Sequence, residues 1–323
     1  MKQDLGLGHI YRCLNLSHYI KSSNELHFMI EDYGNAQQII KEKGYANIVL
    51  LKKDIPTKSD IIKTTQYILN KKIDVVIIDK YKINKRYVAK IKKITKVILV
   101  TGLRDNIDYN ADLIINGFIG YKNKIIRNKY GTKCLLGPAY QILNHKYAKK
   151  TIPTRKKYDL LATFGGFDSA NIITILMKVL LNHKRIKTRI ILGPATNKTK
   201  EIQEIEQKCK KYLSIVKQTF DMRKEISQTH FGICAGGITT YEFSAMQVPF
   251  AIICQYEHQI VTAREWQKKK IAKNLGFIQG NEKKLDILLR QLVQNKIQLK
   301  SRKIVDGLGS KRVAEQIIKI ATS

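Results

Sequence analysis

The chain has 323 residues, of which 44% are hydrophobic and 26% are charged. This length suits two domains of about 150 residues each, and the even spread of charge argues against long disordered segments. No apolar run reaches the roughly 18 residues of a membrane-spanning helix, and no signal peptide opens the chain. A soluble protein of the cytoplasm is therefore expected.

The formal net charge of +33 comes from 47 Lys and 12 Arg against 26 acidic residues. Such a charge suggests an anionic partner. The excess of Lys and Ile is also what an AT-rich coding sequence produces, and this drift is the first explanation. Weak peripheral association with an anionic membrane is the second. Specific nucleic-acid binding is not expected, because neither an Arg preference nor interleaved aromatic residues are evident.

The five cysteines form no disulfide framework and no metal-binding spacing, and their number is odd. This usage is typical of a reduced compartment. Neither a metal nor a cofactor is expected. The cysteines are Cys13, Cys134, Cys209, Cys234 and Cys254.

In the first half of the chain, apolar runs of strand length alternate with segments of helical periodicity. The predicted strands are 26–30, 47–51, 73–79, 96–101, 112–116 and 133–136, and the predicted helices are 10–21, 36–43, 59–70 and 84–94. Several strands are apolar on both faces, as buried parallel strands are. Residues 1–150 therefore predict a Rossmann-like domain.

A basic segment at 145–157 containing Pro153 indicates a domain linker, after which the alternation resumes. Residues 151–323 predict a second Rossmann-like domain. Its strands are 159–164, 189–192, 214–216, 231–234 and 250–254, and its helices are 170–182, 198–211, 223–228, 240–246, 261–273, 282–295 and 311–321. Two such halves make a GT-B layout, an α/β fold whose ligand lies in a cleft between the domains.

Two glycine loops precede helices and are candidates for phosphate contact. The first, Gly6-Leu7-Gly8-His9, lacks the third glycine of a dinucleotide fingerprint. His9 at this helix start fits either a cap or a catalytic base. The second contains Gly165 and Gly166, which either make a turn or approach phosphate, and it is followed by Asp168 and Ser169 as natural helix caps.

The segment 233–242 carries the strongest signal, since a buried strand runs through Gly236 and Gly237 into a helix. Backbone N–H groups in such a turn suit a diphosphate, and Thr239 and Thr240 lie beside them. Glu242 could accept both ribose hydroxyls of a nucleotide. Its spacing from Thr239 equally fits a capping box. The loop 255–259 follows the next strand at the same sheet edge, so its Gln259 is a candidate contact to sugar or phosphate.

Together these segments resemble the UDP-2,4-diacetamido-2,4,6-trideoxy-β-L-altropyranose hydrolases of pseudaminic acid biosynthesis. These enzymes are related to the peptidoglycan N-acetylglucosaminyltransferase and share its GT-B fold. The resemblance covers nearly the whole chain in order. It rests on the segments 6–14, 77–81, 136–143, 165–168 and 235–242, and on the Gln259 loop leading to 274–276.

The resemblance implies hydrolysis of a UDP-linked amino-deoxy sugar at the anomeric carbon. It implies His9 as the general base, with Asp79 and Tyr81 beside it, and Glu242 as the ligand of the uridine ribose. Glycines 165, 166, 236 and 237 with Thr239 and Thr240 would bind UDP, and Gly8, Tyr140 and Gln259 would contact sugar or phosphate. A histidine can take a proton from water near neutral pH, and no metal is required.

The sequence differs from the family pattern at three places. The strand that precedes the first glycine in the family is missing, so the first sheet is expected to lack its central strand. The family's Asp-His-Tyr is Asp79-Lys80-Tyr81 here, and its acidic pair after the fourth strand is Thr101-Gly102. Two alternatives therefore stay open: a glycosyltransferase using the same UDP site, and a catalytically impaired UDP-sugar-binding protein.

Overall fold

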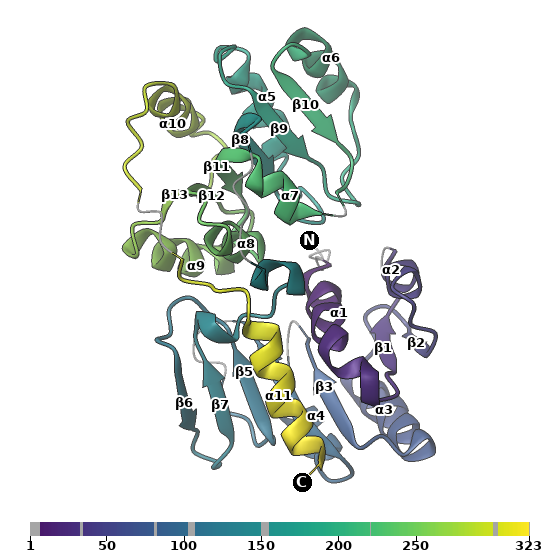
Figure 1. Ribbon diagram of the computed structural model, residues 1–323. Coiled ribbons are helices and arrows are strands. Elements are labelled where there is room, and N and C mark those ends of the chain that lie inside the picture. Colours follow the sequence, from purple (N-terminus) through teal and green to yellow (C-terminus); the bar gives the residue numbers. More distant parts are fainter. Residues whose placement is uncertain are drawn as a thin grey trace. The chain divides into compact units, whose positions relative to one another are not determined.

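The computed structural model describes residues 7–32, 35–80, 83–102, 107–149, 155–219, 221–299 and 303–322. The chain forms two compact units, drawn in Figure 1. Unit 1 comprises Met1–Gly8 and Lys149–Asp306, and unit 2 comprises His9–Ala148 and Gly307–Ser323. The chain thus leaves unit 1 between Gly8 and His9, and it returns at Lys149.

Unit 1 is built on one sheet of six parallel strands, in the order β10-β9-β8-β11-β12-β13. The strands are β8 (Tyr158–Thr163), β9 (Thr188–Ile191), β10 (Leu213–Val216), β11 (Thr229–Cys234), β12 (Phe250–Ile253) and β13 (Ala272–Gly276). From β8 the chain moves outward to one edge of the sheet, and from β11 it moves outward to the other. The switch point therefore lies between β8 and β11, where doubly wound sheets bind ligands beyond the carboxyl ends of their strands.

Helices connect consecutive strands of this sheet, and one more helix follows the last strand. The connecting helices are α5 (Ile172–Leu180), α6 (Lys200–Cys209), α7 (Met222–Ser227), α8 (Thr239–Ala245) and α9 (Glu257–Lys268), and α10 (Lys283–Val293) follows β13. The apolar faces of α5, α6 and α10 bury one side of the sheet in a cluster that includes Leu176, Met177 and Leu288. The strands at the centre of the unit are apolar on both faces, as predicted from their sequence.

The described residues of unit 2 form two sheets. The larger has the order β3-β4-β5-β7-β6 and consists of β3 (Val75–Ile78), β4 (Lys96–Thr101), β5 (Leu113–Asn116), β7 (Lys133–Leu136) and the antiparallel β6 (Lys124–Arg127). The smaller pairs β1 (Phe28–Glu31) with β2 (Ile48–Leu51) in parallel. The helices are α1 (Gly8–Ile20), α2 (Ala36–Glu42), α3 (Thr57–Lys71), α4 (Lys85–Ile91) and α11 (Gly309–Thr322).

Strand β3 is an edge strand among the described residues, although its sequence is that of a central strand. Val76 and Ile78 pack into the cluster under α3 and α4, whereas Val75 and Ile77 face the cluster under α1 and α11. Both faces are thus covered, yet most of β3 is only half-buried while β4 is almost wholly buried. The exposure of β3 therefore arises at its open edge.

Helix α11 belongs to unit 2, whereas the sequence placed residues 151–323 in a single second domain. Val313, Ala314 and Ile317 of α11 lie in one apolar cluster with Leu16 of α1 and Ile98 of β4. Ser310 at the start of the helix donates to the carbonyl of Leu143 at 2.5 Å. The apolar stripe of α11 could be read from the sequence, but the sheet that it covers could not.

Two strands were not predicted. Residues 261–273 were expected to form one helix, but α9 ends at Lys268 and residues 272–276 form β13. Strand β13 reads Ala-Lys-Asn-Leu-Gly, which has little intrinsic β-propensity and is held by pairing with β12. Strand β6 is short and largely exposed, so it carries little apolar signal.

The open edge of β3 predicts uneven protection of backbone amides. Those amides of β3 that point away from β4 lack a strand partner among the described residues, so they should exchange faster than the amides of β4. Hydrogen exchange measured by mass spectrometry on peptides covering 75–78 and 96–101 tests this. Equal protection of the two strands would show that the edge is closed in solution.

Candidate functional site

Three loops of unit 1 meet at the carboxyl ends of adjacent strands. They follow β8 (residues 164–171), β11 (residues 235–238) and β12 (residues 254–256), and these three strands are neighbours in the sheet. The first two loops flank the switch point and carry the predicted glycine pairs. The sheet therefore brings together two segments that are about 70 residues apart in the sequence.

Two glutamines hold these loops against one another. The side-chain amide of Gln255 donates to the carbonyl of Phe164 at 2.8 Å, and its oxygen accepts from the amide of Ser169 at 2.9 Å. The side-chain oxygen of Gln259 accepts from the backbone amides of Gln255 at 2.8 Å and Gly236 at 3.4 Å. Gln259 is buried and braces the glycine turn, a contact that the sequence did not suggest.

The predicted glycines have different surroundings. A methyl group on Gly236 would lie 2.8 Å from Cβ of Gln259, so only glycine fits there without a shift. Gly237 is exposed and has open space where a side chain would begin. Gly165 has a φ of +79°, which favours glycine. A methyl group on Gly193 would lie 2.1 Å from the carbonyl oxygen of Gly165. The loop after β8 is thus tightly packed, with Gly237 open beside it.

The residues after the glycine turn divide into buried and accessible ones. Thr240 is buried, and its hydroxyl donates to the carbonyl of Gly237 at 2.7 Å, so it stabilises the turn. Glu242 is half-buried in the first turn of α8. The pKa of the Cys234 thiol is raised mainly by burial, and the nearby charge of Glu242 raises it further. The helix N-cap is Ile238, which has no side-chain oxygen. The structure therefore lacks the Thr239 cap that the capping-box alternative required.

Asp168 caps α5, and it is one of the two candidate caps, Asp168 and Ser169, that the sequence offered. Its carboxylate accepts from the backbone amides of Ile172 at 2.9 Å and Ile173 at 2.8 Å. Burial raises the pKa of Asp168, and these two hydrogen bonds oppose that shift. The first-turn amides of α5 are thereby satisfied within the protein.

The segment that leads into α1 packs on the same loops. A methyl on Gly8 would lie 3.4 Å from the side chain of Ile238, and one on Gly166 would lie 3.6 Å from the amide nitrogen of Leu7. Leu7 is buried. His9 is the next residue along the chain and begins unit 2. Gly6 lies outside the described residues.

In unit 2, His9 belongs to a compact charged cluster with Arg12 and Asp79. His9 Nδ1 lies 2.6 Å from Oδ1 of Asp79. Arg12 holds the same carboxylate with two bonds, from Nε to Oδ2 at 2.7 Å and from Nη2 to Oδ1 at 2.6 Å. His9 and Arg12 are three residues apart on α1 and so share a helix face. Asp79 directly follows β3.

The charge of Asp79 fixes the histidine tautomer. Burial acts to raise the pKa of Asp79, but the charge and hydrogen bonds of Arg12, with those of His9, outweigh it and hold the pKa at about 2. The carboxylate is therefore ionised and can only accept. Arg12 Nη2 also lies 2.8 Å from His9 Nδ1, but an Nδ1 without a proton would face the anionic Oδ1 of Asp79 lone pair to lone pair at 2.6 Å. We therefore place the proton on Nδ1, which leaves the lone pair on Nε2.

Asp79 and His9 differ in their exposure to solvent. The side chain of Asp79 is 1% exposed, whereas that of His9 is 26% exposed. A buried anion that orients a partly exposed imidazole is the arrangement in which histidine acts as a general base. Arg12 was not singled out from the sequence, although its spacing from His9 could have indicated it.

Lys80 fixes the same strand end from the opposite face. Its ammonium group pairs with the buried Asp60 of α3 and lies 5.0 Å from the ring centroid of Tyr87 on α4. Thr64 links Asp60 and Tyr87 through its hydroxyl, at 3.1 Å from each. Asp79 and Lys80 thus tie the end of β3 to the helices on both sides of the sheet.

The remaining predicted residues are not joined to this cluster by any described contact. Tyr140 ends a short 3₁₀ turn (Pro138–Tyr140) and packs against the apolar cluster under α11. Thr101 is buried, and its hydroxyl points to the carbonyl of Ile115 at 3.5 Å. Tyr81 lies outside the described residues, so its role stays a prediction.

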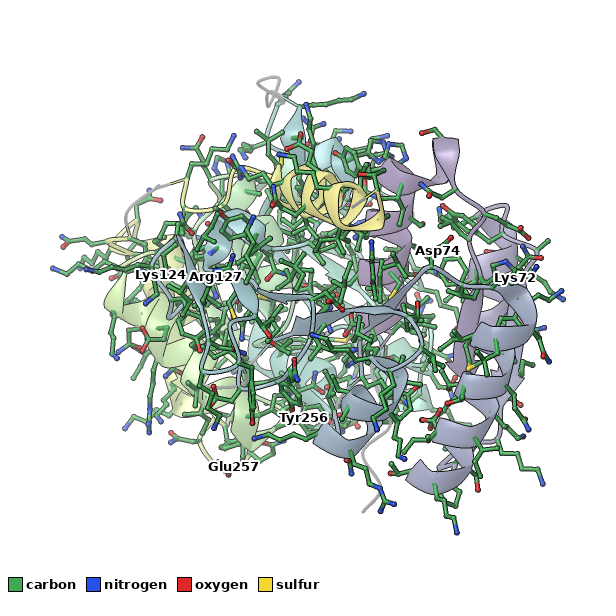
Figure 2. The ribbon with its side chains drawn as sticks, turned by 90° about the horizontal axis from the view of Figure 1, so that it is seen from below. Lys72, Asp74, Lys124, Arg127, Tyr256 and Glu257 are labelled. Carbon is green, nitrogen blue, oxygen red and sulfur yellow. The ribbon has the colours of Figure 1, made fainter. Side chains whose placement is uncertain are left out.

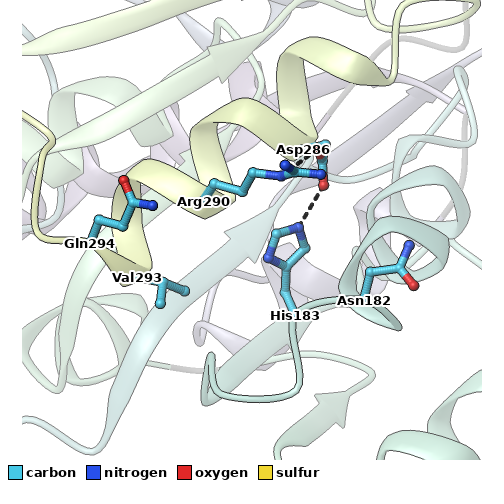
Figure 3. A pocket seen from close by; sticks show the side chains of 6 residues that line it. All are labelled: Asn182, His183, Asp286, Arg290, Val293 and Gln294. Carbon is cyan, nitrogen blue, oxygen red and sulfur yellow. Dashed lines mark hydrogen bonds and ion pairs between the residues drawn. The ribbon is translucent and has the colours of Figure 1, made fainter.

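A polar pocket of about 320 Å³ lies in unit 1, between α10 and the loop after α5 (Figure 3). There Asp286 bonds His183 Nε2 at 2.7 Å and Arg290 Nε at 2.9 Å. The hydrogen bond from His183 is the main reason that the pKa of Asp286 is lowered. His183 precedes β9, so this pocket lies toward the amino ends of the strands, away from the glycine loops. We interpret the cluster as a tie between α5 and α10.

Within the described ranges, no group of three or more His, Cys, Asp and Glu side chains is placed to hold a metal ion. The same residues contain no helix with the length and apolar character needed to cross a membrane. All five cysteines are free thiols.

Comparison of sequences identifies distant relatives. No protein-family model matches the chain. It is 26% identical over 281 residues to an uncharacterized protein of Methanocaldococcus jannaschii, a match that covers 82% of this chain and 56% of that protein. It is 25% identical over 280 residues to the spore coat polysaccharide biosynthesis protein SpsG of Bacillus subtilis, covering 84% of this chain and 80% of SpsG. The chain thus spans little more than half the length of the first relative.

Solved structures resemble the whole chain. MurG of Acinetobacter baumannii aligns with a TM-score of 0.68 and 13% identity, covering 97% of this chain and 96% of MurG. MnaA of S. aureus, solved with UDP, aligns with a TM-score of 0.64 and 12% identity, covering 98% and 95%. The chain has the GT-B fold. The fold class predicted from the sequence, two Rossmann-like domains, is confirmed.

The Asp79 cluster predicts a strong dependence of stability on this one carboxylate. Its folded pKa of about 2 lies below the roughly 3.9 of an unfolded chain, so its contribution is present above pH 4 and is lost as the pH falls toward 2. We expect Asp79→Asn to lower the free energy of unfolding at pH 7 by about 2–3 kcal/mol. The difference from the parent should shrink on acidification.

Asp108→Asn is the matched control in the same unit. Asp108 makes an exposed pair with Lys129 at 3.5 Å, so its loss should cost at most about 0.5 kcal/mol. Urea unfolding of both variants between pH 3 and pH 7 gives the comparison. An Asp79→Asn protein as stable as the Asp108→Asn protein at pH 7 would contradict the account of the cluster.

Proposed function

We propose that this chain hydrolyses a UDP-linked amino-deoxy sugar at its anomeric carbon, releasing UDP and the free sugar, in the biosynthesis of a nonulosonic acid or another surface glycan. The observation that carries the proposal is the 2.6 Å pair of His9 with the ionised Asp79. Support for the substrate class comes from SpsG, which is named for polysaccharide biosynthesis, and from fold neighbours solved with nucleotides. One is the UDP-GlcNAc 2-epimerase of Neisseria meningitidis bound to UDP-GlcNAc.

The glycine loops of unit 1 are the proposed UDP site. Gly165 and Gly166, with Gly236 and Gly237, flank the switch point of the sheet, and Gly237 leaves open space for a phosphate. In the proposal Thr239 lies beside this turn and Glu242 accepts the ribose hydroxyls. Thr240 and Gln259 support the turn through their hydrogen bonds to it. Tyr140 remains a proposed sugar contact, on the family resemblance alone.

His9 is the proposed general base. Nε2 takes a proton from water as the water oxygen bonds to the anomeric carbon, and the bond from that carbon to the diphosphate oxygen breaks with its electron pair leaving on UDP. Asp79 holds Nδ1–H and stabilises the imidazolium that forms, while Arg12 keeps Asp79 ionised.

A glycosyltransferase is the second candidate. The glycotransferase of kitacinnamycin shares the fold with a TM-score of 0.64 and 12% identity, covering 97% of this chain. On this alternative a sugar or lipid hydroxyl replaces water, and the same histidine would accept its proton. A protein that binds a UDP-sugar without turnover is the third candidate.

Substitution of His9 separates these candidates. His9→Gln should reduce the release of UDP from a UDP-sugar by about 10²–10⁴-fold, with UDP affinity unchanged within a few-fold, since only proton transfer is lost. A panel of UDP-sugars with and without acceptors, followed by UDP release, measures the rate, and titration calorimetry with UDP measures the affinity.

Glu242→Ala is the companion variant, and it should affect UDP binding instead of proton transfer. It should weaken UDP binding by about 1.5–3 kcal/mol through the loss of a charged hydrogen bond. Full hydrolysis by the His9→Gln protein would refute the general-base assignment. Turnover only in the presence of an acceptor would favour the glycosyltransferase, and tight UDP binding without any turnover would favour the binding protein.

The two adjacent glycines provide an independent test of the UDP site. Gly237→Ala places a methyl group in open space, so the unfolding temperature should stay unchanged while UDP binding weakens if phosphate approaches there. Gly236→Ala forces the side chain of Gln259 to move and should lower the unfolding temperature as well. Titration calorimetry and thermal unfolding of both proteins supply the data. Unaltered UDP affinity in the Gly237→Ala protein would place the phosphates elsewhere.

A further inference from the structure

Strand β6 forms an open border of unit 2, with Ile126 packed on the cluster under α3 and α4 and its other face left without a covering helix. It is the last strand of its sheet among the described residues and pairs only with β7. Helix α11 covers the neighbouring strands, since its cluster includes Leu135 of β7 and Ile115 of β5 but no residue of β6 (Figure 1). Ile125 is opposite Leu135 in register, yet its side chain is 54% exposed.

The hairpin of β6 and β7 is strongly basic. Residues 121–133 contain four Lys and one Arg and no acidic residue, within an acid-free stretch that runs from 113 to 158. Lys122 and Lys124 make no ion pair with any described residue, and Arg127 uses one nitrogen to bond the carbonyl of Gly131 at 2.6 Å. Lys124 and Arg127 are labelled in Figure 2. Lys129 pairs with the exposed Asp108, whereas the other cations of the hairpin have no acidic partner among the described residues.

Two large apolar side chains are exposed among these cations. Ile125 lies between Lys124 and Arg127 on β6, and Tyr130, 48% exposed, lies in the turn that leads to β7. The Lys129 ammonium lies 5.5 Å from the centroid of the Tyr130 ring. A border that combines aliphatic and aromatic side chains with lysine is suited to the boundary between lipid headgroups and acyl chains, where the apolar parts enter and the cations contact phosphate.

We propose that the β6–β7 hairpin docks unit 2 on a bilayer surface rich in anionic phospholipid. Charge complementarity favours this partner, because most cations of the hairpin are lysines. A duplex nucleic acid would offer no apolar contact to Ile125 and Tyr130, since its backbone is hydrophilic. Each basic side chain near an anionic leaflet strengthens binding about fivefold. The docking goes beyond the proposed UDP-sugar chemistry and does not depend on it.

Vesicle binding by matched variants tests the proposal. The hairpin variant carries Lys122→Gln, Lys124→Gln and Arg127→Gln, and the control carries Lys208→Gln, Lys210→Gln and Lys211→Gln on the exposed surface of unit 1. Both lose three positive charges. Co-sedimentation with phosphatidylcholine vesicles containing 30% phosphatidylglycerol should show at least tenfold weaker binding of the hairpin variant and at most a twofold change in the control.

An apolar pair of variants completes the experiment. Ile125→Ser should weaken binding several-fold, whereas Ile62→Ser, at an exposed isoleucine of α3, should not. Thermal unfolding verifies that all four proteins are folded. Equal losses in the hairpin and control variants would show that adsorption follows net charge alone and would overturn the proposal. So would hairpin-dependent binding to RNA without hairpin-dependent binding to vesicles, or a parent protein that does not bind the anionic vesicles.

Discussion

The organisation of unit 2 around the proposed catalytic histidine depends on one buried ion pair. Asp79 is almost wholly removed from solvent, and its charge is tolerated only because Arg12 bonds both carboxylate oxygens. This pair joins α1 to the end of β3, and it fixes the His9 ring. On the other face of the strand, Lys80 and the buried Asp60 repeat the arrangement with α3. Two consecutive residues therefore set both helix layers against the strand end.

The sequence predicted the fold well where periodicity was strong. Buried strands such as β4 and β5 consist mainly of apolar residues, and these were found within a few residues of their bounds. The alternation of such runs with helices led directly to the GT-B layout. Strands β6 and β13 were missed because tertiary pairing, and not intrinsic propensity, makes them strands.

Individual residues of the candidate site were predicted from the sequence, but the hydrogen bonds that join them across the fold were not. The glycine pairs and Asp168 could be found from turn and cap chemistry, since those effects are local. The bracing by Gln255 and Gln259 could not, because it joins loops that follow different strands. Arg12 was overlooked although its spacing from His9 was visible, because its carboxylate partner lies 67 residues away and only the folded sheet brings the two together.

The order in which the chain is made gives the division into units a further consequence. Apart from Leu7 and Gly8, the described part of unit 1 lies within residues 149–306, whereas unit 2 needs α11, which follows them. During synthesis unit 1 can complete its core while Leu16, Ile98 and Leu135 of unit 2 still lack the helix that covers them. Unit 2 therefore matures last, and its exposed apolar face would be open to chaperones, or to aggregation, for as long as α11 remains in the ribosome.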